Sequence, residues 1–290
     1  MAATALRNFI EFQDLSADTI ASILVRAGEL ECLWRERRMP QALVGRAAAL
    51  IVDDGGWRNT TAFDLGIQAM GGICVHVPVA LGGREATADL AGYLDNWFDL
   101  IIMRTRELAA IRDLADAAEA PVINARTRTN HPCETLGDLA YVTKKRGRFE
   151  RLTVAGVAPD ANILRSWIEA SLSLPINVIQ INPAAWQVKD PTLLNPRFRA
   201  TQDMRALEAA DVIFTDSWPG DAADEDLAPY QVSVEVLERC KPDVIFLPCP
   251  PVTRGQEVAA DAMVHPACQS RQAKAFLLHA QNALMEWMVR

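Results

Sequence analysis

The chain has 290 residues, half of them hydrophobic, and its formal net charge at pH 7 is −8. This length and composition suffice for one large domain or two medium ones. The negative charge disfavours a surface that binds nucleic acid or an anionic membrane, although it allows a local basic pocket for a small anion. Every apolar run is shorter than the roughly 18–20 residues that span a bilayer.

Cysteine usage and the first residues indicate the compartment. The six cysteines lie far apart, and no CxxC pair is present, so their spacing predicts neither a zinc cluster nor a redox motif. Scattered cysteines in a chain of this size are typical of a reducing environment. Because the first residues also lack a signal-peptide core, we predict a cytoplasmic protein without a membrane segment.

Hydrophobic patterns alternate between strand and helix along the first half. In chain order we expect a helix at 15–36, a strand at 47–54, a helix following the loop 55–61, a strand at 74–78, a helix at 87–96, a strand at 100–104, a helix at 107–119 and a strand at 121–124. This alternation predicts a mostly parallel sheet with helices on both faces.

The second half repeats the alternation. We expect strands at 152–157, 177–183, 211–216 and 243–248, and helices at 163–174, 204–210, 232–241 and 269–290. The sequence therefore predicts an α/β protein with two doubly wound parallel-sheet domains, at residues 1–130 and 131–269. The last helix, 270–290, is expected to return to the first domain.

Polar side chains follow the predicted strands, where open α/β sheets bind their ligands. In the first half these are Arg58, Arg104 and His131, and the backbone N–H groups of Gly55 and Gly56 precede a helix start. Cationic donors and such N–H groups favour a small phosphate-bearing ligand. Any one arginine is more simply interpreted as a solvated or salt-bridged surface residue, so the prediction depends on the whole set.

The stretch His131-Pro132-Cys133-Glu134 combines a histidine, a thiol and an acid where a strand gives way to a helix. The simpler interpretation is a helix entry with a proline and an acid in the first turn. The signatures of P-loop NTPases, of GxGxxG dinucleotide sites and of the GxSxG nucleophile elbow are absent from the sequence.

Several segments resemble, in order and spacing, the aspartate/ornithine carbamoyltransferase family, and the ornithine branch in particular. They are Arg58 with Phe63 and Gly71-Gly72, the segment from His131 to Leu139, Thr215-Asp-Ser-Trp218, and the segment from Phe246 to Val258, which contains Cys249 and Arg254. The resemblance covers nearly the whole chain. Each short motif is moderately specific, but the ensemble is specific.

The resemblance implies a carbamoyl-phosphate domain followed by an acceptor domain, a homotrimer or a multiple of it, and neither a metal nor an organic cofactor. The implied reaction transfers the carbamoyl group of carbamoyl phosphate to an amine, with ornithine the expected acceptor. By this resemblance the catalytic residues are Arg104, His131 and Cys249. The carbamoyl-phosphate ligands are Gly56, Trp57, Arg58, Asn59, Thr60, Arg84, Arg104, His131, Glu134 and Arg254, and the acceptor ligands are Asp160, Asn162, Asp216, Cys249 and Pro250.

The sequence departs from the family pattern at both substrates. Gly56, Trp57 and Asn59 stand where the family has hydroxyl residues, and Glu134 replaces a glutamine. A carboxylate there weakens the binding of an anion unless it is protonated or paired. Two alternatives therefore stay open beside the ornithine enzyme, namely a transferase for another amine and a family member that only binds or assembles. A phosphorolytic enzyme running the reaction backward would use the same residues.

Overall fold

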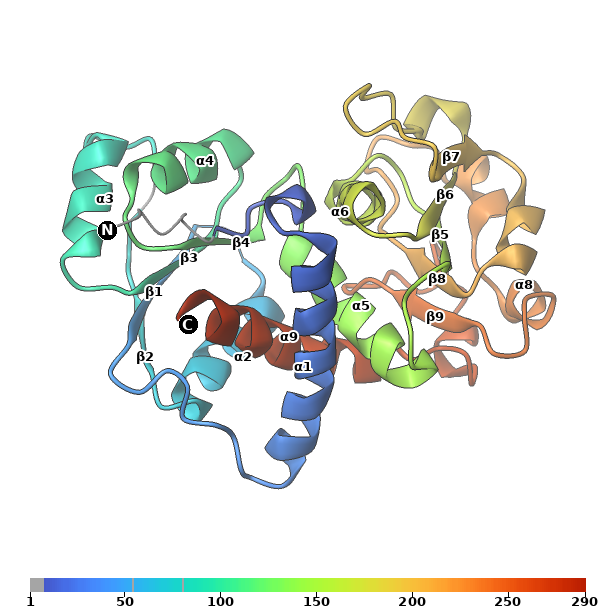
Figure 1. The fold of residues 1–290 in the computed structure, drawn as a ribbon. Helices are drawn as coiled ribbons and strands as arrows, with labels where there is room; N and C mark the ends of the chain where they lie inside the picture. The colour runs from blue at the N-terminus through green and yellow to red at the C-terminus, as the bar shows by residue number, and fades with distance from the viewer. Residues whose placement is uncertain (1–7, 54, 80) are drawn as a thin grey trace. The chain divides into compact units, whose positions relative to one another are not determined.

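The computed structural model describes residues 8–53, 55–79 and 81–290, and residues 1–7, Asp54 and Ala80 lie outside the described part. The chain forms two compact units (Figure 1), which are residues 1–145 with 275–290, and residues 146–274. Each unit has its own parallel sheet, so the predicted fold class is confirmed. Within the described residues, no helix combines the length and apolar character that crossing a membrane requires.

Unit 1 is built on a four-stranded parallel sheet with the order β2-β1-β3-β4. Its strands are β1 (Ala47–Val52), β2 (Ile73–His76), β3 (Leu100–Arg104) and β4 (Val122–Arg126). Its helices are η1 (Phe12–Asp14), α1 (Ala17–Arg35), α2 (Trp57–Ala69), α3 (Thr87–Asp95), α4 (Leu108–Ala117), α5 (Pro132–Arg146) and most of α9 (Ser270–Met288).

The two faces of this sheet are covered by different helices (Figure 1). On one face α3 and α4 bury a cluster that includes Ile51, Leu94, Met103 and Ile111. On the other lie α1, α2 and α9. Burial of apolar side chains on both faces explains why β1 and β3 read as continuous hydrophobic runs.

The last helix packs on unit 1, as predicted from the sequence. The guanidinium of Arg26 in α1 donates to Glu286 in α9 at 2.7 Å, and the ring of Phe276 lies 5.4 Å from that of Tyr141 in α5. A side chain at Gly66 in α2 would collide with Asn282. The contact with Tyr141 also explains why nearly all of α5 belongs to unit 1, although α5 follows the division predicted at residue 130.

Unit 2 contains a five-stranded parallel sheet with the order β7-β6-β5-β8-β9. Its strands are β5 (Thr153–Val157), β6 (Asn177–Ile181), β7 (Phe198–Thr201), β8 (Val212–Thr215) and β9 (Ile245–Pro248). Its helices are α6 (Asn162–Ser173), α7 (Asp224–Leu227), α8 (Val234–Glu238), η2 (Ala184–Trp186), η3 (Met204–Ala209), η4 (Ala228–Tyr230) and η5 (Ala262–Val264).

Unit 2 differs from the sequence prediction in two helices and one strand, and it also contains four short helices that were not predicted, namely η2, α7, η4 and η5. The helix expected at 204–210 is the 3-10 helix η3, and the helix expected at 232–241 shortens to α8. Strand β7 was not predicted. It is a four-residue edge strand whose side chains are at least partly exposed, so it lacks the apolar run that marks the buried strands.

Candidate functional site

The order of strands in unit 1 places a switch point between β1 and β3. The chain leaves β1 for β2 on one side of it, and β3 then pairs with β1 on the other side. Ligands of open α/β sheets bind outside the carboxyl ends of the strands at such a point. In this unit those ends are Val52 and Arg104, which pair with each other in the register of β1 and β3.

Arg104 is the cation at this switch point, and only 8% of it is exposed. Its pairing with Arg126 skips Ala125, so an irregularity in the ladder sits at this residue. Such irregularities re-aim side chains beside binding sites. The guanidinium approaches Gly56 so closely that a Cβ there would lie 2.2 Å from its Cζ atom. Gly56 has φ of +90°, and its missing side chain therefore lets Arg104 reach the start of α2.

The first turn of α2 carries the other predicted phosphate ligands. The Gly56 carbonyl accepts the N–H groups of Asn59 and Thr60 at 3.1 and 3.3 Å, and the Thr60 hydroxyl turns back to the Trp57 carbonyl at 3.2 Å. Arg58 is exposed, and its guanidinium lies 4.9 Å from the centre of the Trp57 ring. This helix start offers N–H donors and the positive end of a helix dipole.

Asn59 and Trp57 occupy positions that the sequence left ambiguous. Asn59 lies on the buried face of α2 with Phe63 and Gly66, and its amide has no hydrogen-bond partner among the described residues. Trp57 is 68% exposed. The indole therefore does not fill a buried pocket.

A buried polar network holds the turn before His131, and the sequence analysis did not identify it. The Asn124 amide donates to the Asn130 side chain at 2.7 Å and to the Ile10 carbonyl at 3.0 Å. The Thr127 hydroxyl donates to Asn130 at 2.9 Å. Buried hydrogen bonds of this kind hold the turn in one backbone conformation. The signal in the sequence was an asparagine inside a buried strand, followed by a threonine and an asparagine in the short loop after it.

His131, Cys133 and Glu134 take distinct positions at the start of α5. The Nε2 atom of His131 lies 3.8 Å from a carboxylate oxygen of Glu134, and both residues are buried. Cys133 is fully buried, and its thiol donates to the Asn124 carbonyl at 3.3 Å. Burial, and to a lesser extent the Glu134 charge, raises the pKa of Cys133 above its usual range. This thiol is a packing group and not a thiolate nucleophile.

Unit 2 has its own switch point, between β5 and β8. Asp160 and Asn162 follow β5, and Asp216 follows β8. Both oxygens of Asp160 are bound by Arg165 of α6, at 2.6 and 2.9 Å. Asp216 is half-buried and accepts the N–H group of Ser217 at 2.8 Å. Asp160 is therefore already neutralised by a bidentate ion pair.

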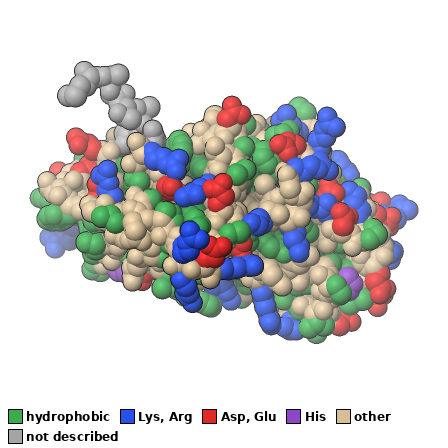
Figure 2. Space-filling model, turned by 60° about the horizontal axis from the view of Figure 1, so that its bottom comes forward, with side chains coloured by type: hydrophobic (Ala, Val, Ile, Leu, Met, Phe, Trp, Pro, Cys, Tyr) green, Lys and Arg blue, Asp and Glu red, His purple; other side chains and the backbone are tan. Residues whose placement is uncertain are grey.

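The remaining predicted ligands are spread over both units. Cys249 follows β9, is half-buried, and its N–H group donates to the Thr215 carbonyl at 3.1 Å, which brings the ends of β8 and β9 together. Arg254 is exposed and donates to the Ala260 carbonyl at 3.2 Å. Arg84 is exposed in the turn before α3. Figure 2 shows Lys and Arg side chains interspersed with Asp and Glu on the face drawn.

Two family models match the chain and together cover most of it. Residues 7–144 match the model described as aspartate/ornithine carbamoyltransferase, carbamoyl-P binding domain. Residues 150–288 match the model described as aspartate/ornithine carbamoyltransferase, Asp/Orn binding domain. The two matches adjoin near the junction of the two compact units.

Named relatives agree with these models. An ornithine carbamoyltransferase of Nitrobacter winogradskyi is 31% identical, over 98% of this chain and 97% of that protein. The crystal structure of ornithine carbamoyltransferase from Burkholderia thailandensis has a TM-score of 0.91 at 29% identity and covers 98% of each chain. The enzyme from Pyrococcus furiosus has a TM-score of 0.91 at 26% identity, over 98% of this chain and 97% of that one.

Proposed function

The chain belongs to the aspartate/ornithine carbamoyltransferase family, and on that premise we propose that it transfers the carbamoyl group of carbamoyl phosphate to ornithine, forming citrulline and phosphate. The observation that carries this proposal is the contact of the Arg104 guanidinium with the start of α2 at the switch point of unit 1. A buried cation beside a helix N-terminus suits an anion that carries both phosphate and carbonyl oxygens.

In the proposed reaction the ornithine side-chain amine attacks the carbonyl carbon of carbamoyl phosphate. The carbon–nitrogen bond forms through a tetrahedral intermediate, the bond from carbon to the phosphate oxygen breaks, and the proton lost by the amine passes to the departing phosphate. Negative charge develops on the carbonyl oxygen, and Arg104 and His131 are the donors we assign to it. We assign Arg58 and the N–H groups at the start of α2 to the phosphate, which leaves as a stable anion.

We assign the acceptor to the strand ends of unit 2. Asp216 suits the ammonium of an amino acid, since Asp160 is committed to Arg165. Asn162 at the start of α6, Cys249 and the Pro250 carbonyl are further acceptor ligands in this proposal. The assignment of Asp160 to the acceptor, made from the sequence, is less favourable because binding there would have to compete with a bidentate guanidinium.

Three further features of the proposal come from the family resemblance. A homotrimer is the proposed assembly, with the loop of Arg84 reaching the phosphate of a neighbouring subunit. Arg254 keeps its proposed role as a phosphate ligand. A cytoplasmic location stays a prediction. The alternative of a binding or assembly protein is not favoured, because the matching family models and the named relatives are carbamoyltransferases.

The experiment is an assay of the full-length protein with carbamoyl phosphate and ornithine, read by both phosphate release and citrulline formation. We expect saturable rates in both substrates and equal amounts of the two products. Lysine, putrescine and aspartate serve as competing acceptors. If one of these amines gives a higher kcat/KM than ornithine, that amine replaces ornithine as the proposed acceptor. If none of the amines causes phosphate release, and carbamoyl phosphate also gives no thermal shift, the transferase assignment is overturned altogether.

A further inference from the structure

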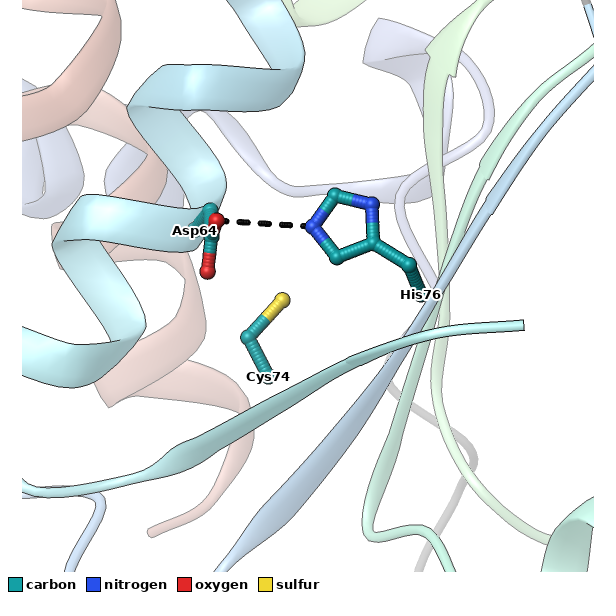
Figure 3. A group of neighbouring side chains, drawn as sticks. All are labelled: Asp64, Cys74 and His76. Atoms are coloured by element: carbon teal, nitrogen blue, oxygen red, sulfur yellow. Dashed lines mark hydrogen bonds and ion pairs between the residues drawn. The ribbon is translucent and has the colours of Figure 1, made fainter.

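A second group of chemically capable side chains lies in unit 1, away from the residues assigned to carbamoyl phosphate. It consists of Asp64 in the middle of α2 and of Cys74 and His76 in β2. One potential ligand atom from each of the three lies within 4.8 Å of the other two. Figure 3 shows the thiol and the imidazole turned toward the Asp64 carboxylate from the neighbouring strand.

The secondary structure explains why these three meet. Side chains two apart in a strand point to the same face, so Cys74 and His76 share the face of β2 that α2 covers. Ile73 and Val75 alternate with them on the opposite face. Because β2 is an edge strand of its sheet, one flank of the cluster stays open to solvent.

The distances suit a small tetrahedral ion. Zinc binds sulfur at about 2.3 Å and nitrogen or oxygen at about 2.0–2.2 Å, so tetrahedral ligand atoms are separated by roughly 3.3–3.8 Å. The Asp64 Oδ2 atom already lies 3.4 Å from Nε2 of His76. The longest separation, within 4.8 Å, requires a shift of about 1 Å, which side-chain rotation supplies.

A neighbouring side chain orients the carboxylate. The Gln68 amide, one turn further along α2, donates to the other Asp64 oxygen, Oδ1, at 2.7 Å. Hydrogen bonds to a ligating carboxylate of this kind orient it and tune a metal site. Oδ1 is thereby occupied, and Oδ2 faces His76. The His76 side chain is 60% exposed and that of Asp64 is 33% exposed, so an ion has a path from solvent.

The thiol is protonated until an ion arrives. Burial, followed by the charge and hydrogen bonding of Asp64, raises the pKa of Cys74 to about 12. A divalent cation at the centre of the cluster would reverse this effect, because a coordinating thiol loses its proton to solvent when the metal binds. Binding would therefore release a proton and strengthen as pH rises.

We propose that Asp64, Cys74 and His76 form a zinc-class metal site that ties α2 to the edge strand β2, with Gln68 positioning the carboxylate and water as the fourth ligand. Thiolate, imidazole and carboxylate are the donor set that zinc prefers over magnesium or calcium. The site is separate from carbamoyl transfer and its test does not depend on the proposed function. The spacing of cysteines alone did not predict it, because only one of its ligands is a cysteine.

The first test titrates the full-length protein with Zn²⁺ by calorimetry and with Co²⁺ by absorption spectroscopy. We expect one ion per chain, a thiolate-to-cobalt charge-transfer band in the near ultraviolet, and a zinc-dependent rise of Tm that a chelator reverses. Proton release measured in buffers of different ionisation enthalpy should accompany binding. A cobalt spectrum without a thiolate band, or the absence of binding, would overturn the proposal.

The second test uses substitutions at exposed or half-buried positions. Loss of an outer partner of a metal ligand weakens binding by about 10- to 100-fold. We therefore expect about 10-fold for Gln68→Ala and at least about 100-fold for Cys74→Ser or His76→Gln. The matched controls are Cys240→Ser and His265→Gln, which leave the cluster intact. Tm measured with chelator monitors folding, and unchanged zinc affinity in Cys74→Ser would refute the site.

Discussion

Both sheets have a switch point in their strand order, but the side chains at the two switch points carry opposite charges. In unit 1 the strand ends at the switch point bring Arg104 to the start of α2. In unit 2 the corresponding ends carry Asp160 and Asp216. Ligand position in an open sheet follows from strand order, whereas ligand class follows from the few side chains in the loops. A cation at a helix start fits phosphate, and an acid fits an ammonium group.

The two sites also differ in what positions their charged side chains. Asp160 is held by Arg165, which also reaches Asp190 at 3.2 Å, so this part of unit 2 is a closed ion-pair network. In unit 1 the close approach of Arg104 to Gly56 depends on a residue without a side chain. The substitutions below test whether unit 1 is responsible for the anion and unit 2 for the amine.

The largest effect is expected from Arg104→Lys. Lysine keeps the charge but lacks the planar fork of five donors, and it is not matched to the space over Gly56. Loss of one transition-state donor costs about 10²–10³ in kcat, which initial rates of phosphate release with both substrates saturating would measure. Arg106→Lys, at an exposed position two residues later, is the matched control and should stay within about twofold. Equal losses in the two variants would break the assignment of Arg104.

The next effect separates the two acids of unit 2. Asp216→Asn should raise the KM for ornithine by about 10- to 100-fold, because a hydrogen bond to a charged group contributes about 1.5–3 kcal/mol. The KM for carbamoyl phosphate should stay unchanged if the acid acts only on the amine. Asp160→Asn is the control, since its carboxylate already pairs with Arg165. A larger ornithine effect at Asp160 than at Asp216 would reverse the acceptor assignment.

A pH experiment on activity must separate titration in the site from loss of folding stability, because unit 1 has a buried histidine, His279, in α9. Desolvation, aided by Arg35, lowers the pKa of His279 to about 4. The unfolded chain, in which the histidine pKa is near 6.5, binds the proton more readily than the folded chain. The free energy of unfolding therefore falls as the pH is lowered from about 6.5 to about 4. Between pH 7 and 5 this amounts to about 2 kcal/mol.

His279→Phe should remove that part of the pH dependence, because the ring contacts with Trp34 and Phe276 are retained without a titrating group. Denaturant unfolding at pH 7 and pH 5 measures the difference between the variant and the natural chain. His265→Phe, in unit 2, is the control. If all three proteins lose the same free energy of unfolding between pH 7 and pH 5, His279 does not govern the loss. A loss of activity at pH 5 would then be assigned to the groups of the two sites and not to His279.

Much of the fold could be predicted from the sequence because most of its strands are buried on both faces, with the edge strands β2 and β7 as exceptions. β1, β3 and β4 are marked by apolar runs, and the capped start of α1 by Ser16. Edge strand β7 and the 3-10 helix η3 lacked such patterns, since their side chains are partly exposed and their backbone is set by tertiary pairing.

The site could be predicted only as a set of residue types at strand ends. The sequence placed Arg58, Arg104 and His131 after the right strands, since parallel strands end at one edge. The approach of Arg104 to Gly56 and the pairing of Asp160 with Arg165 depend on rotamers and long-range register, which no local pattern specifies. For the same reason no sequence motif marks the meeting of Asp64 and Cys74, which are separated by nine intervening positions.

The smallest effect is expected from Glu134→Gln, and it tests an acid that lies beside His131 in unit 1. Its carboxylate is buried and lies 3.8 Å from His131, the residue assigned to the carbonyl oxygen, so its negative charge lies close to the proposed anion. The neutral amide should raise carbamoyl-phosphate affinity by about tenfold, or roughly 1.4 kcal/mol, measured by titration calorimetry. Glu107→Gln, at an exposed position, should leave affinity within about twofold. If affinity instead falls in Glu134→Gln, the carboxylate accepts a hydrogen bond from the carbamoyl amide. The turn at His131 would then bind the ligand through its N–H donors and not through its negative charge.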